Sequence, residues 1–307
     1  MTTIPAVGVV IVSWNGGEGT DRCIESMRAQ RVVDYRIVLV DNDSEAVERA
    51  RLRQRYGNVA DVELIELPAN RGYAGGNNAG IERALQLGAR FVLVLTQDVV
   101  LRADALAHLL AAAQRHPNAG VLGPVVIDAQ SGAEQSRGER IVLPLLCAPR
   151  TLLRYRRVRS EPYAVSGLLG CVVLLTRRCL EEVGAFDPAY FAYYEEVDLC
   201  LRAGRAGYEI LCVPTAVAAH DGMRGFAGGF TPLSAELKSR NLLYLMRKHG
   251  GLVDWVGFWP LYSALIASSM IWYALRGRGD IVRALGRGLR GGWRGRTGAP
   301  TPAPQTL

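Results

Sequence analysis

The chain has 307 residues, of which 49% are hydrophobic and 21% charged, and its formal net charge is +7. This length allows one large domain core, or one domain with an appendage, and the composition is that of a globular protein with some apolar excess. The six cysteines form no CxxC pair, so we expect reduced, mostly buried thiols in a cytosolic protein. The apolar run 7–12 is too short for a signal peptide and lacks its basic flank.

The positive charge is concentrated near the C-terminus. Seven arginines and a single acidic residue, Asp280, lie between Arg276 and Arg296, directly after an apolar segment. A basic tail beside an apolar segment favours contact with an anionic membrane surface. The aromatic residues do not interleave with this charge as base-stacking platforms would, so we expect no nucleic-acid partner.

Apolar runs and helical stretches alternate along the first third of the chain. We predict strands over 7–12, 36–40, 62–67 and 91–95. Helices are predicted over 20–30, 44–56 and 103–115, and a Gly/Asn-rich loop over 70–80 opens another helix that runs to about residue 87. This alternation predicts an α/β fold with a doubly wound, mostly parallel sheet and right-handed crossovers. After residue 126 the pattern loosens, and further elements are expected over 171–175, 178–183 and 208–213.

Residues 255–275 form an uncharged stretch that is long enough to cross a bilayer, and aromatic residues stand at both of its ends. Pro260 and three serines argue against a spanning helix. The flanking arginines should stay cytoplasmic, so we expect an interfacial or re-entrant helical pair. A buried C-terminal helix of a soluble protein is the alternative. The expected domains are 1–250, a sheet domain, and 251–307, an apolar helical segment with a basic Gly/Arg-rich tail.

Two buried strands end in carboxylates. The run 36–40 leads into Asp41, and the run 91–95 leads through Thr96 and Gln97 into Asp98. In open α/β sheets, ligands bind beyond the carboxyl ends of the strands. A carboxylate at this edge suits a cation or a hydrogen-bond donor, so the two residues predict a ligand site.

Five motifs carry a resemblance to a known family. In chain order they are VVIVSWN over 9–15, DNDS over 41–44, NRGYAGGN over 70–77, QD at 97–98 and YEEVDL over 194–199. Together they resemble family 2 glycosyltransferases of GT-A fold, in particular the bacterial rhamnosyltransferase-like branch that extends lipid-linked cell-surface glycans. The resemblance covers about residues 7–250.

The resemblance implies a nucleotide-sugar site on the first half of the chain. Asp41 would accept the N3–H of a pyrimidine base, and the 70–80 loop would cover the ribose and phosphates. The residues assigned to this site are Ser13, Asn15, Asp41, Asn42, Asn70, Gly72, Gly76, Asn77 and Gln97. Two alternatives stay open: Asp41-Asn42 as a turn with Ser44 as the N-cap of the next helix, and a simple strand-to-helix turn at 70–80.

The resemblance also implies a divalent cation, Mg²⁺ or Mn²⁺, held by Asp98 and His220. Such a cation stabilises the departing nucleotide diphosphate. Relatives often offer two acidic residues where this chain has Thr96-Gln97-Asp98. A structural role for His220 is the alternative.

Glu196 would be the catalytic base that takes the proton of the acceptor hydroxyl. The family usually has aspartate at this position. Glu195, Asp198, Gly167 and Arg240 would line the acceptor side. A solvated acidic helix start is the alternative for Glu195 and Asp198, and Asp198 could instead orient Arg202.

The resemblance thus implies inverting, metal-dependent glycosyl transfer from a nucleotide diphosphate-sugar to a lipid-linked or cell-surface glycan. dTDP-rhamnose is the leading donor, and the expected location is the cytoplasmic face of the cell membrane, peripheral or re-entrant. A catalytically silent nucleotide-sugar-binding subunit of a membrane complex is the alternative. A nucleotidyltransferase is disfavoured because no basic Gly-rich loop follows the first strand.

Overall fold

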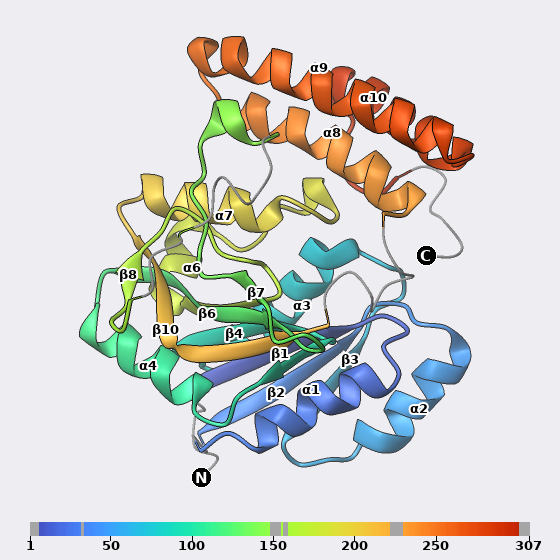
Figure 1. The fold of residues 1–307 in the computed structure, drawn as a ribbon. Helices are drawn as coiled ribbons and strands as arrows, with labels where there is room; N and C mark the ends of the chain where they lie inside the picture. The colour runs from blue at the N-terminus through green and yellow to red at the C-terminus, as the bar shows by residue number, and fades with distance from the viewer. Residues whose placement is uncertain (1–5, 32–33, 148–154, 156–158, 222–229, 301–307) are drawn as a thin grey trace.

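The computed structural model describes residues 6–31, 34–147, 155, 159–221 and 230–300. One ten-stranded sheet forms the centre of this part of the chain, with helices on both faces and a helical layer above (Figure 1). The main strand order is β3-β2-β1-β4-β9-β6-β10-β5, while β7 pairs with β6 and β8 with β10.

The first half of the sheet is parallel, as the βαβ alternation predicts. Its strands are β1 (Val7–Ser13), β2 (Tyr35–Asp41), β3 (Val62–Glu66) and β4 (Phe91–Thr96). β1 lies between β2 and β4, in a register that puts Ser13 opposite Asp41 and Val12 opposite Thr96. The carboxyl ends of β1, β2 and β4 therefore meet at one edge, where a ligand site was predicted.

The second half of the sheet is mixed. β9 (Val172–Thr176) runs antiparallel between β4 and β6 (Ala119–Asp128), and β10 (Glu209–His220) is parallel to β6. Four strands escaped the sequence analysis: β6, of ten residues, and the short strands β5 (Val99–Leu101), β7 (Glu134–Ser136) and β8 (Tyr163–Ala164). Runs of two or three residues carry too little periodicity to be recognised. β10 is also seven residues longer at its C-terminal end than expected and reaches His220, which pairs with Val99.

Two apolar cores pack on the two faces of the sheet. Helices α1 (Glu18–Arg28), α2 (Ala46–Tyr56) and α4 (Ala105–Arg115) cover one face. Helices α3 (Gly72–Gln86), α6 (Arg177–Val183) and α7 (Glu195–Arg205) cover the other. In β1, Val9 and Ile11 enter the first core and Val10 the second, as the alternation of side chains in a strand requires. The six cysteines are free, and five are buried, as predicted.

The Gly/Asn-rich segment is mostly helix, which corrects the expected loop over 70–80. α3 begins at Gly72, so the later glycines are helical. A Cβ added at Gly80 would lie 2.3 Å from Val10 Cγ1, and one at Gly76 would lie 3.0 Å from Val12 Cγ1. These glycines let the helix approach β1 closely, where the sequence had suggested close approach to a ligand.

Three C-terminal helices form the upper layer: α8 (Pro232–His249), α9 (Leu252–Leu275) and α10 (Gly279–Trp293) (Figure 1). They share one apolar core that includes Leu243 of α8 and Phe258 of α9. The expected boundary at residue 250 therefore falls inside a packed unit. α8 also contributes Leu245 to a small core with Tyr190 and Val197 below it.

α9 exposes most of its length. In the described chain it is the one helix long and apolar enough to cross a membrane, judged by length and composition, and 17% of its most apolar window is buried. Phe258, Tyr262 and Ile266, spaced four residues apart, face the protein, whereas Leu252, Val253 and Leu275 are more than 80% exposed. The alternative of a buried core helix is therefore wrong.

Candidate active site

The loop after β1 is tied to the end of β4 by Gln97. The Trp14 amide donates to Gln97 Oε1 at 2.8 Å, and Gln97 Nε2 donates to the Trp14 carbonyl at 3.3 Å. A Cβ on Gly16 would lie 2.3 Å from Gln97 Oε1, so only glycine fits there. The Gln97 amide thus fixes the position of the loop after β1. Any nucleotide contact by Gln97 would come from a side chain that is already hydrogen-bonded to the Trp14 backbone.

Ser13 and Asn15 lie differently from each other. The Ser13 side chain is fully buried and hydrogen-bonded to Thr20 Oγ1 at 2.9 Å, so it faces α1 and not an open pocket wall. Asn15 is exposed, with a φ of +49°, and its Oδ1 accepts the Glu45 amide at 2.8 Å. Of this predicted pair, Asn15 is the one whose side chain lies at the surface of the site.

Asp41 is fully buried and bonded on both carboxylate oxygens. Oδ1 accepts the Ser44 amide at 3.2 Å, and Oδ2 accepts Arg49 Nε at 3.2 Å. Ser44 is not the N-cap, which corrects that alternative: α2 begins at Ala46, and Ser44 Oγ accepts the amide of Asn15. The carboxylate at the end of β2 thus shapes the turn to Ser44, and Ser44 in turn holds the loop that carries Asn15.

Asn42 organises the start of α3. Its Nδ2 donates to Asn70 Oδ1 and to the Gly72 carbonyl, both at 3.1 Å, and its Oδ1 accepts the Arg71 amide at 2.9 Å. Gly72 has a φ of +69°, and a Cβ there would lie 2.3 Å from the carbonyl oxygen of Phe191. The structure therefore brings Asn42, Asn70 and Gly72 together and holds them against the segment before α7.

Asn77 lies one helical turn further along α3. It is 1% exposed, and its Nδ2 donates to the Tyr73 carbonyl at 2.9 Å. Its Oδ1 is buried and has no hydrogen-bond partner in the described part of the chain. An acceptor left open in this way is costly unless a ligand or water supplies a donor.

Asp98 and His220 meet, as predicted, although 121 positions separate them. His220 Nε2 lies 3.4 Å from Asp98 Oδ2, and Thr96 Oγ1 donates to Asp98 Oδ1 at 2.6 Å. Burial raises the pKa of Asp98, but the hydrogen bonds from His220 and Thr96 outweigh it, so the pKa lies below its usual value. The carboxylate is therefore ionised at neutral pH.

Gln135 of β7 orients the imidazole of His220. Gln135 Nε2 lies near two acceptors, Asp128 Oδ2 and the His220 carbonyl, so its Oε1 faces His220 Nδ1 at 2.9 Å. An amide oxygen only accepts, so Nδ1 carries a proton, and Nε2 is the ring nitrogen that faces Asp98. This outer hydrogen bond is the arrangement that prepares histidine for a metal.

The donor atoms suit a divalent cation that takes few protein ligands. One carboxylate and one imidazole nitrogen converge, and no group of three or more His, Cys, Asp or Glu side chains lies together within the described ranges. Mg²⁺ is commonly bound by one or two carboxylates together with substrate phosphates, and carboxylate oxygens also suit Mn²⁺. Substrate phosphates would therefore complete the coordination.

The segment before α7 has a strained backbone. Phe191, Tyr193 and Tyr194 have φ values of +65°, +71° and +76°. Asn241 of α8, fully buried, donates from Nδ2 to the carbonyls of residues 190, 192 and 193 at 2.9, 2.8 and 3.0 Å. On the other side, the Phe191 carbonyl accepts the amide of Ala74 in α3. Such conformations persist only where the surroundings hold them, and they gather at functional sites.

Glu196 stands directly after this segment, and Gly170 packs on its stem. A Cβ at Gly170 would lie 3.2 Å from Glu196 Cβ and 3.4 Å from Tyr73 Oη. Tyr73 Oη donates to the Gly170 carbonyl at 2.5 Å. Burial, followed by the charges of Glu195, Glu196, Cys171 and Asp98, raises the pKa of Tyr73 well above its usual value. Tyr73 thus lies within electrostatic reach of both carboxylate groups of the site.

Glu195 is 4% exposed, and its Oε2 is a buried atom with no hydrogen-bond partner in the described part of the chain. Burial, and then the neighbouring charge of Glu196, raise the pKa of Glu195 well above its usual value. Glu196 is half-buried, at the N-terminal turn of the same helix. Of these two carboxylates, that of Glu195 therefore lies in the interior, and Glu196 is partly exposed.

Three predicted acceptor-side residues have other contacts. Asp198 is fully buried and binds Arg202 Nε at 2.7 Å and His249 Nε2 at 2.8 Å, so it joins α7 to α8 and orients Arg202. Arg240 is 4% exposed and donates to Asn241 Oδ1 and to backbone carbonyls. A Cβ on Gly167 would lie 2.8 Å from Ile141 Cδ1, so this glycine allows Ile141 to pack against the backbone.

Four residues of the site were missed from the sequence. Arg49 bonds Asp41, and Tyr73 bonds the Gly170 carbonyl. Gln135 bonds His220, and Asn241 bonds the strained segment. Gln135 lies in the stretch where periodicity is lost. Tyr73 lies within the 70–77 motif and Asn241 follows the predicted Arg240, but their partners are about 50 to 100 residues away in sequence.

The comparisons with known proteins agree with this geometry. The sequence profile of glycosyl transferase family 2 matches residues 8–184. The N-acetylglucosaminyl-diphospho-decaprenol L-rhamnosyltransferase of Mycobacterium tuberculosis is 30% identical over 79% of this chain and 85% of its own length. The dTDP-rhamnosyl transferase RfbF of Shigella flexneri is 25% identical over 69% of this chain and 71% of its own.

Two solved structures share the fold. The mannosyltransferase PcManGT of Pyrobaculum calidifontis, in complex with GDP-Man and Mn²⁺, superposes with a TM-score of 0.60, 15% identity, and coverage of 95% of this chain and 88% of its own. GalNAc-T7 with UDP, GalNAc and Mn²⁺ superposes with a TM-score of 0.58 and 19% identity, over 72% of this chain and 44% of its own. The predicted GT-A fold is confirmed.

Proposed function

Because the chain belongs to glycosyl transferase family 2, we propose that this glycosyltransferase moves a sugar, with inversion, from a nucleotide diphosphate-sugar to a lipid-linked glycan acceptor. dTDP-rhamnose is the donor we favour. Two relatives, an N-acetylglucosaminyl-diphospho-decaprenol L-rhamnosyltransferase and a dTDP-rhamnosyl transferase, support this choice.

One observation carries the proposal: Tyr73 and Gly170 join the two halves of the site. Gly170 packs on the Glu196 stem and accepts a hydrogen bond from the Tyr73 hydroxyl, and the carbonyl of the next residue, Cys171, accepts the amide of Thr96, whose hydroxyl donates to Asp98. Attack at an anomeric carbon requires a base for the acceptor hydroxyl and a cation for the phosphate that leaves on the opposite side, and Glu196 and Asp98 would serve these two needs.

In this mechanism Glu196 accepts the proton of the acceptor hydroxyl while its oxygen bonds to the anomeric carbon and the bond to the diphosphate oxygen breaks. Asp98 and His220 Nε2 are the residues that would hold a divalent cation, Mg²⁺ or Mn²⁺, and such a cation would supply positive charge for the departing diphosphate. Gln135 holds a proton on Nδ1 of His220, which leaves Nε2 as the nitrogen for the cation, and Asn42 and Asn70 hold the start of α3 that covers the donor. Asn77 Oδ1 is an open acceptor for a donor hydroxyl.

We assign the protein to the cytoplasmic face of the cell membrane, as a peripheral enzyme. α9 packs along α8 and α10 through one face and leaves its other side apolar and exposed. Trp293, 65% exposed, stands beside the arginine-rich end of α10. An apolar helix flanked by tryptophan and arginine suits the interfacial plane of an anionic membrane.

The decisive test is Glu196→Gln in full-length protein, with release of dTDP from dTDP-rhamnose measured in the presence of Mg²⁺ or Mn²⁺ and a farnesyl-diphospho-N-acetylglucosamine acceptor. General base catalysis is worth about 10²- to 10⁴-fold, so we expect a loss of that size with donor binding retained. Glu181→Gln, on an exposed pair with Arg177, is the control. Unchanged transfer by Glu196→Gln would refute the assigned base, and absence of transfer in the wild type with donor bound would favour a silent binding subunit.

A further inference from the structure

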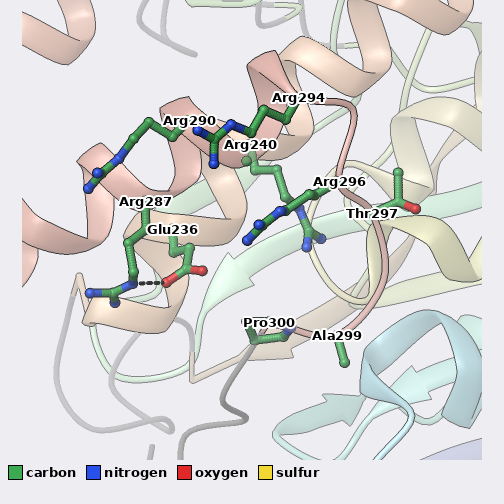
Figure 2. Close-up of a pocket in the computed structure, with 10 residues that line it drawn as sticks. Glu236, Arg240, Arg287, Arg290, Arg294, Arg296, Thr297, Ala299 and Pro300 are labelled. Carbon is green, nitrogen blue, oxygen red and sulfur yellow. Dashed lines mark hydrogen bonds and ion pairs between the residues drawn. The ribbon is translucent and has the colours of Figure 1, made fainter.

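An arginine-lined cavity lies outside the sheet domain, between α8, α10 and residues 294–300 (Figure 2). Its volume is about 600 Å³, within the range of about 300–1,000 Å³ that small-molecule sites occupy. The charged residues that line it are Glu236, Arg240, Arg287, Arg290, Arg294 and Arg296. None of the residues assigned to the donor or to the metal lines this cavity. One lining residue, Arg240, was predicted on the acceptor side.

The cavity holds a strong excess of positive charge. Five arginines face one acidic residue, Glu236, which pairs with Arg287 at 2.7 Å. Within the described ranges, none of the other four arginines lies within 4.0 Å of a carboxylate oxygen. Like charges gathered without counter-ions repel one another, so this arrangement favours a bound anion.

Arg240 forms the floor of the cavity. Its guanidinium, 4% exposed, donates only to neutral acceptors: Asn241 Oδ1 and the carbonyls of Tyr190 and Gly298. Burial lowers its pKa, which means that the charge is poorly solvated. Gly291 lies between Arg240 and Arg296: an added Cβ would be 3.8 Å from Arg240 Cδ and 3.9 Å from Arg296 Cβ. The two arginines thus flank the same point of α10.

The cavity is connected to the active site on one side and to the apolar face on the other. Arg240 Nη2 bonds the Tyr190 carbonyl at 3.0 Å, at the start of the strained segment that leads to Glu196. At the other side, Arg294 follows the exposed Trp293, whose ring lies 5.7 Å from that of Trp259 in α9. An elongated ligand with a sugar, an anionic group and a lipid chain would meet these three regions in that order.

We propose that this cavity binds the diphosphate of the lipid-linked acceptor, an inference that rests on the proposed function. Arginine forks bind phosphate oxygens in pairs, and a diphosphate offers more oxygens and more charge than the single phosphodiester of a phospholipid. With the diphosphate in the cavity, the attached sugar extends toward Glu196 and the lipid chain toward α9. The donor diphosphate belongs to the separate Asp98–His220 site.

The test is the binding of farnesyl diphosphate to the full-length protein in detergent, by titration calorimetry, compared with farnesyl monophosphate. We expect Arg296→Gln and Arg294→Gln each to weaken farnesyl diphosphate binding about tenfold, the size of one lost charge-assisted hydrogen bond. Arg283→Gln, which removes the same charge from an exposed position of α10 outside the cavity, should leave binding within about twofold. Both cavity positions are exposed at the surface, so folding should persist, and a thermal melt checks this.

Three results would overturn the proposal: no binding of farnesyl diphosphate, equal weakening by Arg283→Gln, or cavity variants that lose only binding to phosphatidylglycerol vesicles. The last would assign the arginines to a lipid headgroup. The outcome is separable from the proposed function. Diphosphate binding lost in Arg296→Gln but no sugar transfer by the wild type would sustain the cavity and refute the reaction. Sugar transfer with an unchanged acceptor KM in Arg296→Gln would sustain the reaction and refute the role of the cavity.

Discussion

Asn241→Ala tests whether the strained segment before Glu196 serves catalysis. The two N–H groups of the Asn241 amide serve three carbonyls, those of residues 190, 192 and 193. Each bond contributes about 0.5–1.5 kcal/mol net, and buried carbonyls left without a donor cost about 1–3 kcal/mol, so the variant should lose about 2–3 kcal/mol of folding stability.

The strain exceeds what this amide alone can offset. A non-glycine residue in the left-handed region costs about 1–2 kcal/mol, and three such residues store about 3–6 kcal/mol. The bonds to Ala74 and Arg240 supply part of the remaining restraint. Without Asn241 the segment should therefore relax and shift Glu196, and a misplacement of about 1 Å can cost about 100-fold in rate.

We therefore expect kcat to fall about 100-fold in Asn241→Ala while the Kd for dTDP-rhamnose stays within about threefold. Steady-state kinetics, calorimetric donor titration and urea unfolding measure the three quantities. Ser239→Ala is the matched control, because this buried hydroxyl of α8 donates only to carbonyls of its own helix. An Asn241→Ala variant that loses stability but keeps its kcat would refute the catalytic role of the strain.

Three further predictions concern single contacts. Gly170→Ala puts a methyl group 3.2 Å from Glu196 Cβ, so kcat should fall about tenfold with unchanged donor Kd, and equal kcat would contradict this packing. Gln135→Leu frees Nδ1 of His220, so the Mn²⁺ concentration for half-maximal activity should rise about 10- to 100-fold, and an unchanged metal titration would refute the assigned tautomer. Burial raises the pKa of Asp198, but the basic neighbours lower the pKa by more than burial raises it, to about 2. The pKa of Asp198 is thus lower in the folded state than in the unfolded state. The ionised carboxylate therefore stabilises the fold above about pH 4, and about 2 kcal/mol of folding stability is lost as the pH falls toward 2. Urea unfolding of Asp198→Asn should lack this acid-dependent part.

The parallel half of the fold could be predicted because its strands are long, apolar and separated by helices. The mixed half could not. β9 enters the sheet antiparallel between β4 and β6, and no local pattern encodes the direction of a neighbour. β7 is three residues long, yet it carries Gln135, which orients His220. Helix α3 was taken for a loop at its start because glycine lowers helix propensity, whereas packing against β1 selects glycine there.

The candidate site shows the same division. Motif order predicted that Asp98 and His220 would meet, and they do. Side-chain partners were beyond the sequence, because a carboxylate looks alike whether it faces a ligand or an arginine. Asp41 has Arg49 as a neighbour, and Asp198 has a set of basic partners in α7 and α8. In both cases the charge is compensated inside the protein, which a linear pattern of acidic residues does not reveal.

The contact between α3 and the strained segment has a consequence for how the site operates. Gly72 fits under the Phe191 carbonyl only without a side chain, and Ala74 donates to that carbonyl. A nucleotide-sugar that orders the start of α3 therefore also restrains the backbone leading to Glu196. Asn241 holds the same segment from α8, next to the arginine cavity. Under the proposed function, the backbone that leads to Glu196 is thus held by two contacts, one from α3 on the donor side and one from α8 on the acceptor side.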